Sequence, residues 1–90
     1  MELEQLRIFL AVAECESFSA AAKKLYISHS TTSRTVAALE EELGVELLRR
    51  GNRVLGLTPA GETLRTEAED LLRHAEEAAA RTRASGGKAL

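Results

Sequence analysis

The segment that follows Pro59 constrains the fold of this chain more than any other feature of the sequence. Small or apolar residues recur there at alternating steps of four and three, the spacing of a helix with one apolar seam: Leu64, Ala68, Leu71, Ala75, Ala78 and Thr82. About 25 helical residues would reach roughly 37 Å, which is longer than the rest of so small a domain. Because the chain offers little to cover such a seam, we expect a second copy to pair with it through Leu64, Ala68, Leu71, Ala75 and Ala78.

A turn and a helix start precede this segment. Thr58 can cap a helix, and Pro59 suits the first helical position, where its missing N–H costs nothing. Upstream, residues 47–49 and 54–57 flank a Gly-Asn turn at 51–52. The sequence therefore predicts a small β-hairpin and then a long helix that begins at Pro59.

The beginning of the chain carries a helical stripe. Its apolar residues recur at spacings of three and four: Leu3, Leu6, Phe9, Leu10 and Ala13. Ile8 and Val12 widen the stripe towards a second face. We therefore expect this helix to touch more than its own core, and a partner subunit is one candidate.

Two further helices are predicted close together. Ser17 or Ser19 can cap a helix over residues 19–25, because a serine hydroxyl satisfies amides that the first turn leaves unpaired. Ser28 is a candidate cap for a third helix over residues 29–42. The gap of three or four residues between the two helices is the spacing of a helix-turn-helix.

The two faces of the third helix differ in chemistry. One face is mostly apolar, with Thr32, Val36, Leu39 and Leu43. The opposite face is small and polar, with Ser30, Ser33, Arg34, Ala37 and Ala38. Within the third helix no acid appears before Glu40, and Gly44 supplies the helix stop. The pattern predicts an inner face that joins the core and an outer face open to an anionic partner.

Charge is distributed unevenly along the chain. A net charge of −2 argues against nucleic-acid binding, because affinity for duplex DNA comes largely from lysine and arginine that neutralise phosphates. Yet six of the 12 basic residues lie in two segments without acids, residues 23–39 and 47–57. A local basic surface is therefore compatible with the acidic total.

Several function classes are not supported by the sequence. Cys15 is the only cysteine and there are two histidines, so we expect neither a disulfide nor a metal site. There is no set of nucleophile, base and orienting residue and no glycine-rich phosphate cradle, so we expect no catalysis and no cofactor. No apolar run approaches the roughly 20 residues that span a bilayer, so we expect a cytoplasmic protein without membrane contact.

An ordered and nearly gap-free set of residues between Leu3 and Gly61 resembles one known family. The matching residues are Leu3, Leu6 and Phe9, then Ser17–Leu25, Ile27–Ser28, Ser33–Arg34, Leu39–Glu40, Leu43–Gly44, Leu47–Leu48, Arg50 and Leu57–Gly61. The run is similar to the amino-terminal domain of LysR-type transcriptional regulators of bacteria. Its length makes the resemblance far more specific than a single short motif.

The resemblance implies a mainly α fold. It predicts a winged helix-turn-helix, with three helices and a short β-hairpin wing, over residues 1–58. A linker helix over residues 59–84 would join two copies, and residues 85–90 are expected to form a disordered tail. Members of the family continue into an effector-binding domain, which this chain does not contain, so we interpret the chain as an excised fragment or a truncated regulator.

The resemblance also implies sequence-specific binding of double-stranded DNA. The third helix would enter the major groove with Arg34 as base reader, while Arg53 in the wing would reach the minor groove or backbone. The predicted DNA-binding residues are Ser17, Ser28, His29, Ser30, Thr31, Ser33, Arg34, Ala38, Arg50 and Arg53. The expected operator is an AT-rich inverted repeat bound by a homodimer. Further expectations for the full-length protein are a tetramer and contact with RNA polymerase.

The chain departs from the usual residues of the family at several positions. His29 and Ser30 stand where glutamine and proline are usual, which implies a different base preference. Thr32 replaces an apolar residue, which implies a looser core. Val54 and Gly56 stand where basic residues are common, which implies weaker attraction to the DNA backbone.

A competing hypothesis is a protein-interaction module that kept the winged fold and lost its DNA affinity. The acidic total and the weakened wing would both allow it. Salt dependence separates the two, because phosphate contacts make affinity fall steeply with salt.

Overall fold

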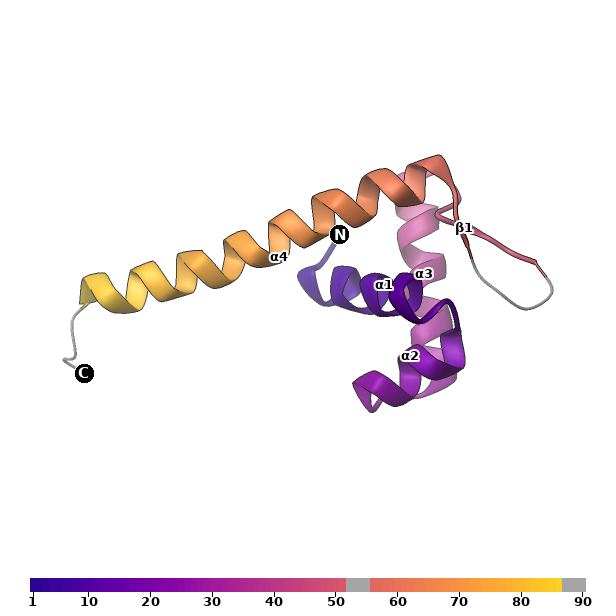
Figure 1. The fold of residues 1–90 in the computed structure, drawn as a ribbon, viewed down its shortest axis with the longest axis horizontal. Coiled ribbons are helices and arrows are strands. Elements are labelled where there is room, and N and C mark those ends of the chain that lie inside the picture. The colour runs from indigo at the N-terminus through magenta and orange to yellow at the C-terminus, as the bar shows by residue number, and fades with distance from the viewer. Residues whose placement is uncertain (52–55, 87–90) are drawn as a thin grey trace.

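The computed structural model describes residues 1–51 and 56–86. Its elements, in chain order, are α1 (Leu3–Cys15), α2 (Phe18–Leu25), α3 (His29–Leu43), β1 (Leu48–Arg49), β2 (Gly56–Leu57) and α4 (Pro59–Gly86). The first three helices and the hairpin form one body, from which α4 projects as a rod (Figure 1). The chain extends 54 Å along its longest axis but only 26 Å and 19 Å along the others. The predicted mainly α, winged helix-turn-helix architecture is confirmed.

The helix ends follow the capping chemistry of the sequence. Ser17, rather than Ser19, caps α2, with its hydroxyl oxygen accepting from the Ala20 N–H at 3.0 Å. The Ser28 hydroxyl caps α3 in the same way. Tyr26 ends α2 in the left-handed conformation, with φ of 59°, and Gly44 ends α3 with φ of 71°. The helix-turn-helix therefore forms where predicted, although α2 begins one residue earlier and α3 ends one residue later.

α1 lies at the centre of the core and packs against α2, α3 and α4. Its Phe9 and Val12 are fully buried, as are Val36 and Leu39 of α3. In α2 the small Ala21 is fully buried, and small residues let two helices approach closely. No helix in the described residues has a stretch long and apolar enough to cross a membrane.

Thr32 enters this core without leaving a polar group unpaired. Its side chain is fully buried, and its hydroxyl donates to the Ser28 carbonyl oxygen at 2.9 Å. Within residues 1–51 and 56–86, every buried side-chain nitrogen or oxygen has a hydrogen-bond partner. The core therefore accommodates the threonine, because a backbone carbonyl one turn earlier accepts a hydrogen bond from its hydroxyl group.

The first strand of the wing begins at Leu48, one residue later than the sequence pattern predicts. β1 and β2 form an antiparallel pair in which Leu48 faces Leu57 and Arg49 faces Gly56. Leu47, predicted in the first strand, is fully buried just before β1. Residues 54 and 55 of the second predicted strand, Asn52 of the predicted turn and Arg53, the predicted minor-groove probe, lie outside the described residues.

The first three turns of α4 belong to the core of the domain. Leu64 and Ala68 are buried in the same cluster as Leu6 and Phe9, and Leu72 packs partly against it. This corrects the assignment of Leu64 and Ala68 to the dimer seam. Both side chains already have intrachain partners, because this part of α4 lies along α1. Only the part of the seam from Leu71 onward stays available, and Leu71 is 43% exposed.

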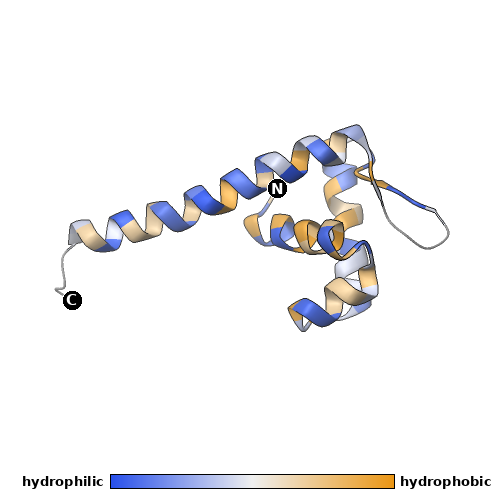
Figure 2. Cartoon of the chain, in the orientation of Figure 1, coloured by the Kyte–Doolittle hydropathy of each residue, from blue (hydrophilic) through white to orange (hydrophobic). Residues whose placement is uncertain are grey.

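The remainder of α4 extends away from the domain. Figure 2 shows it alternating between blue and pale orange, whereas stronger orange gathers on α1 and at the root of the wing. The helix continues to Gly86, two residues past the predicted boundary at 84, so Ser85 and Gly86 are helical and not part of a disordered tail. Residues 87–90 of that predicted tail lie outside the described residues.

Gly61 marks the closest approach between α4 and the wing root. A Cβ atom at this position would lie 2.1 Å from the Leu47 carbonyl oxygen, a distance that a backbone atom cannot tolerate. We predict that Gly61→Ala destabilises the fold by about 2 to 3 kcal/mol, because the chain must shift to relieve the overlap. Chemical denaturation monitored by circular dichroism measures the change.

Gly86→Ala is the matched control, since Gly86 is also helical and a Cβ there meets no atom within 4 Å. It should leave stability unchanged or raise it slightly, because alanine favours helix. Equal stabilities for the two variants would show that the contact between Gly61 and Leu47 is not tight.

Candidate nucleic-acid interface

The outer face of α3 is a solvent-facing surface free of acids. We define it by Ser30, Ser33, Arg34, Ala37 and Ala38, of which all but the half-buried Ser33 are exposed. The face opposite carries Thr32, Val36 and Leu39, which are fully buried. Because an α-helix repeats every 3.6 residues, burying one stripe turns the other outward. The packing of α3 therefore leaves this outer face free to meet a partner.

Arg34 is the central cation of the outer face. Its side chain is exposed, and it forms none of the ion pairs found within residues 1–51 and 56–86. A guanidinium without an anionic partner can offer two parallel N–H donors to a ligand. In a major groove this geometry matches the two acceptors of guanine.

Hydroxyl groups at the start of α3 are partly committed to the helix itself. The Ser28 hydroxyl donates to Thr31 Oγ1 at 2.8 Å and accepts from the Thr31 N–H at 3.0 Å. Ser30 Oγ lies 3.3 Å from Ser28 Oγ and is exposed. Ser17 has a similar capping role in α2. The Ser17 and Ser28 hydroxyls thus already cap helices, and a ligand that contacts them would share these hydroxyls with the backbone N–H groups that they cap.

The other basic residues differ in their surroundings. Lys24 pairs with Glu14 of α1, and that carboxylate raises the pKa of the Lys24 ammonium, mainly through the hydrogen bond between them. Arg49 Nε donates to the Leu57 carbonyl oxygen at 3.3 Å across the hairpin. Arg53 lies outside the described residues. The basic residues are therefore not equivalent, and Arg34 and Lys23 are exposed without an ion pair in the described part of the chain.

Arg50 belongs to a cluster that the sequence did not reveal. Its Nη2 donates to Glu40 Oε1 at 2.8 Å, and its guanidinium carbon lies 5.7 Å from the centre of the Phe18 ring. That ring lies 6.0 Å from the ring of His29, the first residue of α3. Glu40 also accepts from the N–H of Leu47. The sequence singled out Glu40 and Arg50 only as members of the family motif, because the contacts of the Glu40 carboxylate come from a later segment.

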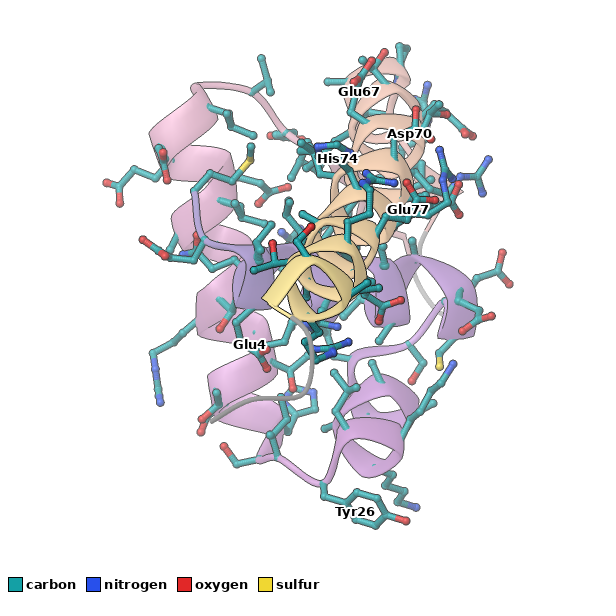
Figure 3. All side chains as sticks on the ribbon, turned by 90° about the vertical axis from the view of Figure 1, so that its left-hand side faces the viewer. Glu4, Tyr26, Glu67, Asp70, His74 and Glu77 are labelled. Carbon is teal, nitrogen blue, oxygen red and sulfur yellow. The ribbon has the colours of Figure 1, made fainter. Side chains whose placement is uncertain are left out.

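The acidic residues of α4 lie apart from the outer face of α3. Glu67, Asp70 and Glu77 come from α4, in the upper half of Figure 3, whereas Tyr26 in the helix-turn-helix lies at the bottom. Several of these acids pair with arginines of the same helix, as Asp70 does with Arg73 at 2.7 Å. These acids therefore lie on a different helix from the outer face of α3, and the acids of α3 itself, of which Glu41 and Glu42 are exposed, follow that face towards the end of the helix.

Comparison with known proteins identifies the family. The model of the bacterial regulatory helix-turn-helix proteins of the lysR family matches residues 3–62. The HTH-type transcriptional regulator ClcR of Pseudomonas putida is 45% identical over 85 residues, which cover 94% of this chain and 29% of ClcR. The regulator BenM of Acinetobacter baylyi is 43% identical over 83 residues, 92% of this chain and 27% of BenM. The chain thus spans less than a third of the length of these relatives.

Solved structures agree over nearly the whole chain. The crystal structure of a CbnR_DBD–DNA complex is 42% identical, with a TM-score of 0.93, and the match covers 96% of this chain and 99% of that one. The BenM_DBD complex with catB site 1 DNA is 40% identical, also with a TM-score of 0.93, and is matched over the full length of both chains. The chain therefore belongs to the LysR family of bacterial helix-turn-helix regulators, a family of transcriptional regulators and not of enzymes.

Proposed function

We propose that this chain binds double-stranded DNA sequence-specifically, as the DNA-binding part of a homodimeric transcriptional regulator in the bacterial cytoplasm. The observation that carries the proposal is the exposed, acid-free outer face of α3 with Arg34 at its centre. Two similar domains, CbnR_DBD and BenM_DBD, have been crystallised with DNA. The operator we propose is an AT-rich inverted repeat, since a two-fold dimer presents its two recognition helices to two half-sites.

Each part of the site has a distinct role in this proposal. Arg34 donates two hydrogen bonds to a guanine in the major groove, while Ser30, Ser33 and Ala38 fit against neighbouring base edges. Phosphates lie at the first turns of α2 and α3, near the predicted contacts Ser17, Ser28, His29 and Thr31, where backbone amides favour an anion. Arg53 would supply the contact of the wing with the minor groove.

Dimerisation is proposed through the projecting part of α4. Leu71, Ala75 and Ala78 are spaced by four and three residues, which places them on one side of the helix. Leu71 keeps 43% of its surface exposed although it is a large apolar residue. A second α4 packed along this stripe would remove that surface from water. Tetramer formation and contact with RNA polymerase are further proposals for the full-length protein.

Arg34→Ala tests the base-reading role. We expect specific binding to weaken by about 1 to 3 kcal/mol and discrimination to relax at one base pair, because a bidentate contact is lost. The affinity and the discrimination are measured by titrating an operator obtained by binding-site selection, with mobility shift or fluorescence anisotropy as the readout. Arg83→Ala removes the same charge near the end of α4 and should bind like the parent. If Arg34→Ala matched Arg83→Ala in affinity and selectivity, Arg34 would not be the reader.

The salt dependence of affinity tests DNA binding itself. The logarithm of affinity should fall linearly with the logarithm of salt concentration, with a slope of about −0.9 for each phosphate that the protein neutralises. A dimer that neutralises several phosphates should lose affinity steeply between low and physiological salt. A flat response, or no binding to any selected duplex, would favour the protein-interaction module instead.

Replacing either of two alanines of α4 by glutamate tests the dimer seam. Ala78 shares the stripe of Leu71, whereas Ala80 lies on the opposite side of α4, and both are exposed. We expect Ala78→Glu to shift the chain towards monomer by at least about tenfold in dimer dissociation constant, because carboxylates would face each other across the seam. Ala80→Glu should leave the constant unchanged. Sedimentation equilibrium measures both, and equal constants for the two variants would place the interface elsewhere.

A further inference from the structure

Glu40 joins the recognition helix to the root of the wing. Its side chain points inward and is only 14% exposed. Oε2 accepts from the backbone N–H groups of Leu47 at 2.8 Å and Leu48 at 3.3 Å, and Oε1 accepts from Arg50 Nη2 at 2.8 Å. One carboxylate therefore satisfies three donors from the segment that leads into the wing.

Arg50 continues this connection towards the other helices. Its guanidinium lies over the ring of Phe18, the first residue of α2, and that ring contacts His29 at the start of α3. The Arg50 side chain is half exposed. It thus lies between its carboxylate partner and an aromatic ring, an arrangement that fixes a guanidinium well.

The ladder described at the base of the wing is short. Within residues 48–49 and 56–57, two residue pairs face each other across the hairpin. The Thr58 N–H donates to the Leu47 carbonyl oxygen at 3.1 Å. Leu47 is therefore held at both its N–H and its carbonyl, so contacts at the root add to this short ladder in fixing the direction in which the wing begins.

We propose that Glu40 is a positioning residue for DNA binding, which acts through Arg50 to hold the wing at a fixed angle to α3. Arg50 then supports DNA binding through its ion pair with Glu40, which we call the strut, and does not itself bind a phosphate. The inference rests on the proposed function and adds to it a residue that touches no DNA. It also revises the role of Arg50, which the sequence placed among the DNA contacts.

The two roles of Arg50 predict opposite signs for Glu40→Gln. If Arg50 were a phosphate ligand, removing the competing carboxylate would free its guanidinium and tighten binding. If the pair is a strut, the amide that replaces Oε1 turns N–H groups towards Arg50, the link breaks, and affinity falls although a negative charge has been removed. We expect a loss of about tenfold, within the range measured for coupled neighbouring residues.

Four variants of the full chain carry the test. Glu40→Gln and Arg50→Met should each weaken operator binding about equally, and the double variant should be no weaker than either single one. Glu41→Gln, an exposed neighbour on α3, removes the same charge without touching the strut and should bind no more weakly than the parent. Circular dichroism at the assay temperature establishes that each variant is folded.

Hydroxyl-radical footprinting supplies a readout that a general loss of stability would not produce. The strut predicts that protection under the wing disappears while protection at the major groove of α3 persists. Arg50→Met keeps the bonds from Glu40 to Leu47 and Leu48, so it tests the strut even if Glu40→Gln unfolds. Tighter or unchanged binding by Glu40→Gln overturns the strut, and so does full wing protection in Arg50→Met. Failure of the parent to bind DNA would instead overturn the proposed function.

Discussion

The burial of one stripe of α3 is the constraint on which the rest of the structure depends. Thr32, Val36 and Leu39 are fully buried, and α3 packs against both α1 and α2. With that stripe fixed, the helical repeat gives α3 no rotational freedom, so the face bearing Arg34 must look outward. Thr32 fits this position because its hydroxyl bonds within the helix. A chain that lacked this inner stripe could carry the same polar residues without presenting them together.

The same packing also determines where the acidic side chains lie. Glu40, the first acid after the outer face, turns inward to the wing root, and its pair with Arg50 ties the wing to α3. Acids of α4 form ion pairs within that helix, such as Glu62 with Arg65. An acidic chain can in this way present a local surface without acids. Two elements suited to DNA, the recognition helix and the wing, are then held on one frame by contacts that are not themselves part of the interface.

Most of the fold could be predicted from local sequence. The caps at Ser17 and Ser28 and the stop at Gly44 act within one or two turns, so their chemistry can be read from neighbouring residues. Leu64 and Ala68 were wrongly assigned, because steps of three and four describe a core stripe and a dimer seam equally well. The role of Glu40 could not be predicted either, since its partners are seven to ten residues away and meet it only through the tertiary fold.

The central claim is that the outer face of α3 meets duplex DNA. An amide NMR titration of the chain with a selected operator duplex tests this claim most directly. The account predicts that the largest shift changes fall on α3 around residues 29–38, and that α4 beyond residue 79 changes little. Saturable binding that leaves the α3 amides unchanged while other segments shift would contradict it.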